Sequence, residues 1–131
     1  MNHSTVIRFA GIAGFLGVGL GAFGAHGLHD LLVRNERLET WETAVLYHLT
    51  HAVALLVVGF SPAPSRAACL AFLTGIVLFS GSLYALALTD FSKLGAITPL
   101  GGVAFLAGWG ILIFGPGRRG DGTPVEPRAG E

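Results

Sequence analysis

The stretch AACLAFLTGIVLFSGSLYALALT, residues 67–89, contains no charged side chain. A bilayer hydrocarbon core about 30 Å thick requires about 20 apolar residues in an α-helix. The stretch meets that length, and its apolar residues do not alternate with polar ones as they do in the strands of a membrane β-barrel. It therefore predicts a membrane-spanning α-helix.

Three other uncharged stretches are long enough to cross a bilayer, namely residues 9–25, 43–60 and 94–117. The first can begin earlier if the long side chain of Arg8 extends to the membrane surface. The second has an amphipathic lead-in from about Leu38. The predicted fold class is therefore an all-α membrane protein, a bundle of four transmembrane helices that residues 1–117 form as one domain.

The composition of the whole chain supports the same class. The chain has 131 residues, of which 52% are hydrophobic and only 12% are charged, and its mean hydropathy is +0.66. An average soluble domain has about 25% charged residues, so this chain would expose large apolar patches in water. Its net charge of +0 provides no basic surface for nucleic acid. A soluble domain, a disordered chain and a nucleic-acid binder are excluded.

The connections between the spans differ in character. Residues 26–42 mix charged and histidine residues with leucines at near-helical spacing, which predicts a short interfacial helix, a turn near Asn35 and Trp41 at the headgroup level. The prolines of residues 61–65 predict a turn. Glycine, proline and charged residues dominate after Pro116, so residues 118–131 are expected to be a disordered polar tail.

The basic residues near the spans predict the orientation in the membrane. Five of them share the side of the two termini: Arg8, Arg66, Arg118, Arg119 and Arg128. Three lie on the other side: Arg34, Arg37 and Lys93. Because cytoplasmic segments carry an excess of Lys and Arg, both termini are expected in the cytoplasm. A secretory signal peptide is the alternative for the N-terminal stretch, and a retained first helix is simpler because three spans follow.

Small residues recur at every fourth position in the first span: Ala13, Gly17, Gly21 and Ala25. Shorter series with this spacing occur in the third and fourth spans: Ala67, Ala71, Gly75, Ala104 and Gly108. Such stripes let membrane helices approach closely. They indicate either a homodimer interface or packing among the four helices of one chain, and packing within the chain is the simpler interpretation. We expect the first stripe to touch another helix through its backbone.

Polar side chains gather in the half of the membrane that adjoins the first and third connections. This candidate polar cluster consists of His26, His48, His51, Ser80, Ser82, Tyr84 and Thr98. The other half is almost entirely apolar. Because polar groups in hydrocarbon seek partners, we expect His51 to point into the bundle, with four candidate partners: Ser80, Ser82, Tyr84 and Thr98.

Three roles remain open for the histidines. His48 and His51 are three residues apart and share a helix face, so with His26 they offer three nitrogens to a metal ion. They also suit a proton relay, because imidazole titrates near neutral pH. The simplest role is hydrogen bonding between helices. Glu39 and Glu42 are expected at the polar surface, and the lone Cys69 as a small buried hydrophobe.

Four motifs identify a family resemblance: GAFGAHGL at 21–28, WETAVLYHLTHA at 41–52, LFSGSLYALAL at 78–88 and ITPLGGVAFLAGW at 97–109. Together they resemble the YgdD-like small inner-membrane proteins, whose family carries only a domain-of-unknown-function label. The resemblance covers all four spans. It implies a four-helix protein of the plasma membrane, in bacteria the inner membrane. It implies no reaction, no cofactor and no site residue.

The sequence thus predicts a multi-pass membrane protein whose biochemical role it does not specify. The first hypothesis is a binding or accessory protein with a polar half-pocket on the side of the first and third connections. The second is a small transporter or proton-coupled channel, and the third is a histidine-dependent membrane metalloprotein. Membrane lipids are the expected partners, with a second copy or another membrane protein as further candidates. We expect no cofactor, no nucleic acid and no enzymatic activity.

Overall fold

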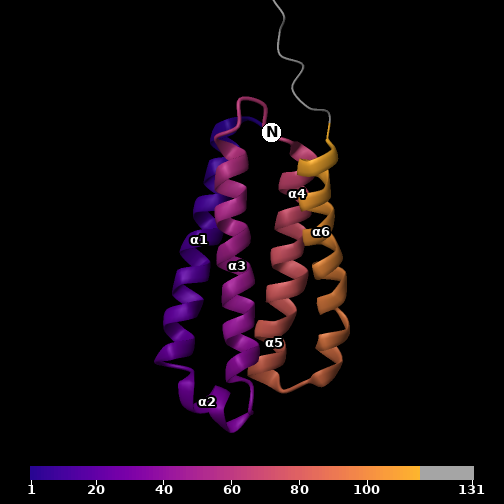
Figure 1. Ribbon diagram of the computed structural model, residues 1–131. Coiled ribbons are helices and arrows are strands. Elements are labelled where there is room, and N and C mark those ends of the chain that lie inside the picture. Colours follow the sequence, from indigo (N-terminus) through magenta and orange to yellow (C-terminus); the bar gives the residue numbers. More distant parts are fainter. Residues whose placement is uncertain (116–131) are drawn as a thin grey trace, which may run out of the picture.

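The computed structural model describes residues 1–115, and in this part of the chain helices joined by short connections are present and strands are absent. Four helical stretches are long and apolar enough to cross a membrane: His3–Ala25, Leu38–Gly59, Arg66–Thr89 and Ser92–Phe114. They stand side by side as an elongated bundle (Figure 1). The predicted all-α fold with four spans is confirmed. The tail predicted for residues 118–131 lies outside the described residues.

The first span is helix α1, His3–Ala25, which begins six residues before the uncharged stretch does. The side chain of Asn2 accepts a hydrogen bond from the backbone N–H of Thr5 at 2.8 Å, and this cap starts the helix early. Arg8 is exposed on the helix surface. The early start places Arg8 within the first span, where its long side chain can extend to the membrane surface.

The first connection contains the expected short helix, α2, His29–Arg34. Asn35 follows it, and its side-chain amide donates to the carbonyl oxygen of Ala87 at 3.0 Å. Arg37 donates to the carboxylate of Asp90 at 2.9 Å. These two contacts join the first connection to the end of the third span, at the lower end of the bundle in Figure 1.

The second span is α3, Leu38–Gly59, and the third is made of three segments: α4, Arg66–Gly75, a π-helical turn η1, Ile76–Ser80, and α5, Gly81–Thr89. The sequence did not predict the π-helical turn. The fourth span begins with a 3-10 turn η2, Ser92–Ala96, and continues as α6, Thr98–Phe114. Proline in the first turn of α6 suits a helix start, because it lacks the N–H that would be unpaired there.

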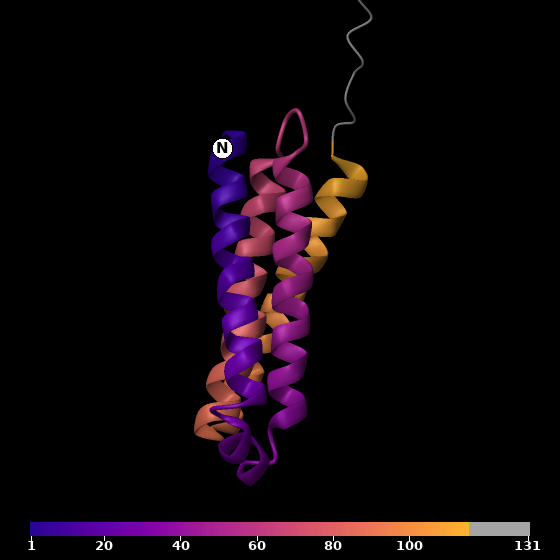
Figure 2. The ribbon, with the colours of Figure 1, turned by 90° about the vertical axis from the view of Figure 1, so that its left-hand side faces the viewer.

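The spans pack most closely in two pairs, α1 with α3 and α4 with α6. α3 also contacts η1 and α5, and so joins the pairs. Seen from the side, α6 inclines away from its neighbours towards the upper end (Figure 2). Two flanking helices therefore expose most of their surface, and two central helices, α3 and the third span, carry most of the core.

The small-residue stripe of α1 packs against α3 of the same chain. A Cβ on Gly17 would lie 2.6 Å from Cδ2 of Leu49, and one on Gly21 would lie 3.3 Å from Cγ1 of Val45. Packing within the chain is thus observed for the centre of the stripe, while Ala25 is exposed. The two glycines thus touch α3 through their own backbone, as expected, and the atoms that meet them belong to side chains of α3.

The stripe predicted in the third span is not continuous, because Ala67 is exposed. Phenylalanines pack on glycines between this span and α6 instead. The ring of Phe105 covers Gly75, and the ring of Phe72 covers Gly108, where a Cβ would lie 2.5 Å from the ring. At Gly101 the neighbour is the backbone of Phe79, so no side chain fits at that position without moving a helix.

Candidate functional site

The structure separates the predicted polar cluster into isolated pairs. The hydroxyl of Tyr84 lies 3.2 Å from Nδ1 of His48 and links α5 to α3. The Tyr84 ring also packs against Trp41, with ring centroids 4.7 Å apart. The indole N–H of Trp41 in turn donates to the carbonyl oxygen of Leu20 on α1 at 3.0 Å. This chain of contacts fixes three helices against one another.

Ser82 and Thr98 form the second pair, with hydroxyl oxygens 2.8 Å apart. The Ser82 hydroxyl also donates to the carbonyl oxygen of Phe79 at 2.9 Å. A hydroxyl has one hydrogen, so Thr98 is the donor in the pair. The pair links α5 to the first turn of α6.

His51 has other partners than the four expected from the sequence. Its Nδ1 lies 2.8 Å from the carbonyl oxygen of Tyr47, and its Nε2 lies 3.2 Å from the indole nitrogen of Trp109. The carbonyl can only accept and the indole can only donate. His51 is therefore a neutral imidazole that carries its hydrogen on Nδ1, and both of its nitrogens are in use.

His26 does not join the other histidines. It is exposed just beyond the C-terminal end of α1, beside a shallow hollow formed by Gly19, Ala22, Phe23 and Gly27. Within the described part of the chain, no three His, Cys, Asp or Glu side chains are placed to hold one metal ion. The arrangement thus does not assemble the three-nitrogen site that the spacing of the histidines suggested.

Of the remaining residues considered from the sequence, the two acidic ones are exposed, and Cys69 and Ser80 are buried. Glu39 and Glu42 are exposed, and Cys69 is fully buried in an apolar cluster. Ser80 is also fully buried, and its hydroxyl has no hydrogen-bond partner in the described structure. It ends the π-helical turn.

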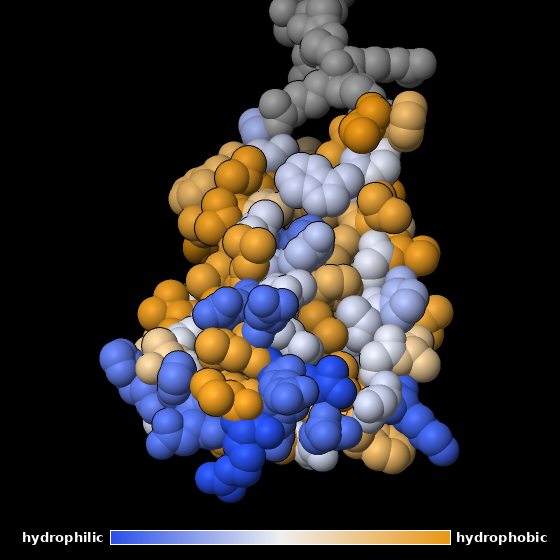
Figure 3. Space-filling model, turned by 60° about the horizontal axis from the view of Figure 1, so that its bottom comes forward, coloured by the Kyte–Doolittle hydropathy of each residue, from blue (hydrophilic) through white to orange (hydrophobic). Residues whose placement is uncertain are grey.

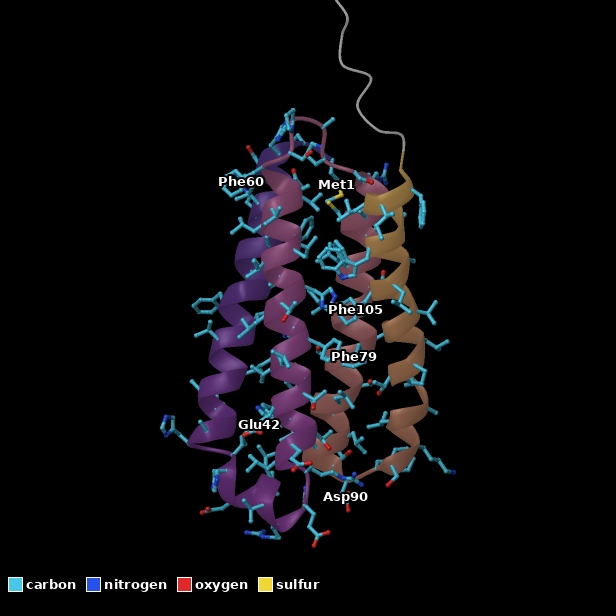
Figure 4. All side chains as sticks on the ribbon, in the orientation of Figure 1. Met1, Glu42, Phe60, Phe79, Asp90 and Phe105 are labelled. Carbon is cyan, nitrogen blue, oxygen red and sulfur yellow. The ribbon has the colours of Figure 1, made fainter. Side chains whose placement is uncertain are left out.

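Aromatic side chains surround His51 and form the most distinctive feature of the bundle. The imidazole stacks on the ring of Phe105 at a centroid distance of 3.5 Å and an angle of 11°. Phe79 packs on Tyr47 at 4.5 Å and on Phe105 at 5.6 Å. Phe79 and Phe105 lie between α3 and the α4–α6 pair in Figure 4. These contacts bring together rings from α3, η1 and α6.

These rings line a groove between α3 and α6, which we call the aromatic groove. Its volume is about 480 Å³. Its lining consists of Tyr47, His51, Phe79, Pro99, Gly102, Val103, Phe105, Leu106 and Trp109. The Tyr47 side chain is 41% exposed, and among residues 1–115 its hydroxyl makes no hydrogen bond.

The molecule becomes more polar towards the end that carries α2 and the connection from α5 to α6. Figure 3 shows hydrophilic residues gathered at this end and apolar residues over most of the rest of the visible face. Pale and blue residues also continue from there into the middle of the face. The hydrophilic end of the surface is therefore the end that carries the first and third connections.

The polar cluster predicted from the sequence did not include the aromatic residues Tyr47, Phe79, Phe105 and Trp109 of the groove. One signal was available, because Tyr47 precedes His51 by four residues and Phe105 precedes Trp109 by four, and residues at this spacing share a helix face. Nothing in the sequence indicated that these two faces would meet.

Residues 20–102 match the family described as "Protein of unknown function (DUF423)". A UPF0382 membrane protein of Bacillus subtilis, YwdK, is 48% identical, and the match covers 82% of this chain and 91% of that protein. A UPF0382 membrane protein of Haemophilus influenzae is 40% identical, and the match covers 83% of this chain and 90% of that protein. A UPF0382 membrane protein of Schizosaccharomyces pombe is 36% identical, and the match covers 83% of this chain and 98% of that protein. No solved structure matches.

Proposed function

This chain belongs to the DUF423 (UPF0382) family of membrane proteins, whose function is unknown, and from that premise we propose that it is a binding or accessory protein of the membrane. The proposed site is the aromatic groove. Its ligand is an amphiphilic molecule that enters from the bilayer, with an apolar body and one group that forms hydrogen bonds.

The observation that carries this proposal is the hydroxyl of Tyr47, which has no hydrogen-bond partner within residues 1–115 and lies beside an apolar wall. A polar group in hydrocarbon costs free energy unless it is hydrogen-bonded, and the other polar atoms around it are already paired, as with His51 and Trp109. Ligand sites have this composition, a mainly apolar lining with a few placed polar groups. Tyr47 therefore supplies the group that would orient a ligand.

Gly102→Leu tests the proposal by filling the groove. A Cβ at Gly102 would have only ordinary contacts, the nearest atom being Cδ2 of Phe79 at 3.9 Å, so the larger side chain extends into the groove without displacing a helix. Gly110→Leu is the matched control on the same helix, because nothing lies within 4 Å of a Cβ there. The measurement is mass spectrometry of small molecules that co-purify with the full chain in nanodiscs.

We expect a molecule that accompanies the wild-type protein and the Gly110→Leu variant but not the Gly102→Leu variant. Tyr47→Phe removes only the hydroxyl and should weaken its retention without changing the fold. If all four proteins carry the same molecules in the same amounts, the aromatic groove is not a binding site.

The two other hypotheses have less support from the geometry. A transporter requires a polar path across the bundle, and the rings of His51, Phe79 and Phe105 pack against one another in the middle of this one. A metal site at His51 would have to break one of the two hydrogen bonds that occupy its nitrogens. Proteoliposomes loaded with a pH-sensitive dye test the channel, and we expect no proton flux above that of empty vesicles.

We further propose that the chain resides in the plasma membrane with both termini in the cytoplasm, as the excess of basic residues on that side favours. The short connection between α3 and α4 adjoins the same end of the bundle as the N-terminus and the end of α6 (Figure 1). The YgdD-like assignment within the family, which the four motifs support, also stays a proposal.

A further inference from the structure

A second hollow follows the seam between α1 and α3, apart from the aromatic groove. Its lower part has a volume of about 480 Å³ and ends at His29 and Glu42. Its upper part has a volume of about 370 Å³ and reaches Phe15 and Leu56. Leu49 lines both parts and lies over Gly17 where they adjoin, and we call the two hollows together the α1–α3 furrow.

Glycines of α1 keep the furrow open. Nothing lies within 4 Å of a Cβ added at Gly11 or Gly14, and both residues line the upper part. Gly21 lines the lower part, opposite Val45. The surface is otherwise apolar, and it faces outward from the bundle.

The furrow has the length of a lipid chain. Glu42 and Leu56 lie on α3 about 21 Å apart along the axis, at 1.5 Å per residue. One leaflet occupies half of a hydrocarbon core about 30 Å thick, or about 15 Å. The two hollows together therefore span the length of an acyl chain of one leaflet, which would begin at the polar end of the bundle and cross Leu49.

The polar end of the furrow carries a negative charge without a counter-charge. The described ion pairs are His29 with Asp30 and Arg37 with Asp90, and the exposed Glu42 takes part in neither pair nor in any hydrogen bond of its side chain within residues 1–115. A partner helix seated in the furrow would cover this carboxylate unpaired, which is costly. A lipid whose headgroup contains a cation brings the missing charge with it.

We propose that the α1–α3 furrow binds one phospholipid with a primary-amine headgroup, such as phosphatidylethanolamine. The ammonium group pairs with the carboxylate of Glu42, and an acyl chain lies over the glycines of α1. An anionic headgroup such as phosphatidylglycerol is disfavoured, because it has no cation to pair with Glu42 and adds a like charge. This site is independent of the aromatic groove.

The test is native mass spectrometry of the full chain after reconstitution in an equal mixture of phosphatidylethanolamine and phosphatidylglycerol. We expect the wild-type protein to retain phosphatidylethanolamine in preference, and Glu42→Gln to reduce that preference about fivefold, the effect of one exposed charge pair. Glu39→Gln is the matched control, because Glu39 is exposed one turn away but does not line the furrow. It should behave as the wild type.

Charge reversal gives a sharper outcome than charge removal. Glu42→Lys should turn the preference towards phosphatidylglycerol, whose phosphate the new ammonium attracts. If Glu42→Gln and Glu42→Lys retain the two lipids as the wild type does, or if Glu39→Gln changes the preference as much, Glu42 does not select the headgroup and the proposal is overturned.

Gly14→Leu tests the acyl chain, because the new side chain projects into the furrow without a clash. It should reduce the number of retained phosphatidylethanolamine molecules by one, while Gly110→Leu should not. Unchanged lipid binding would overturn the proposal. So would a dimer that Gly14→Leu dissociates without loss of lipid, since the furrow would then be an interface between two copies.

Discussion

The indole N–H of Trp109 donates to Nε2 of His51 across 3.2 Å, between residues 58 positions apart in the chain. Among the described residues this is the only hydrogen bond between α3 and α6. It joins two helices that line the aromatic groove, and it determines which ring nitrogen of His51 carries the hydrogen. The pair therefore links the two sides of the groove.

Trp109→Phe should lower the free energy of unfolding by about 0.6 to 1.7 kcal/mol, the range of interhelical hydrogen bonds in membranes. An aromatic ring is kept, while the N–H donor and part of the indole's packing on Phe72 are lost. A double-mutant cycle with His51→Phe, measured by unfolding in mixed micelles, isolates the energy of the pair. Additive effects of the two substitutions would show that the bond contributes nothing.

Gly101→Ala should destabilise the bundle more than Gly17→Ala. The added Cβ at Gly101 meets the backbone of Phe79, whereas at Gly17 it meets the end of the Leu49 side chain, which can change rotamer. Overpacking costs about 1 to 3 kcal/mol. Thermal unfolding in detergent measures both, and Gly110→Ala serves as the unhindered control. Equal losses at the two positions would contradict the close approach of α6 to the third span.

Ser80→Ala and Ser82→Ala should have opposite effects. Ser80 buries a hydroxyl that has no partner among residues 1–115, and its removal should stabilise the protein by about 1 to 3 kcal/mol. Ser82 bonds both Thr98 and Phe79, so its removal should destabilise by about 1 kcal/mol. Unfolding of the two variants side by side gives the comparison. A loss of stability in Ser80→Ala would mean that the hydroxyl has a partner such as an internal water.

A reporter fused after Gly117 should be active only if it works in the cytoplasm, and one inserted after Asp90 should report the opposite side. The expectation rests on the excess of Lys and Arg on the side of the termini. Green fluorescent protein and alkaline phosphatase, fused in parallel, measure the two sides. Phosphatase activity at Gly117 would reverse the orientation and leave the four spans unchanged.

The spans could be predicted because they depend on local properties. Membrane crossing requires a long run without charge, and such a run is a property of consecutive residues such as 67–89. The packing face of α1 was also predictable, because glycines at every fourth position lie on one side of a helix whatever its neighbour is. The contact of Gly17 with Leu49 follows from that face.

The partners of the polar groups could not be predicted in this way. His51 bonds Trp109 rather than the serines, because the rotation and relative height of α3 and α6 decide which side chains meet. Neither quantity can be deduced from the residues of one helix alone. The same holds for the hydroxyls of Ser80 and Tyr47, neither of which has a partner in the part of the chain that the structure describes. The sequence by itself determined the four spans and the charged connections at one end of them. Only the tertiary structure decided the grooves and the pairs within them, because these arise from distances between residues far apart in the chain.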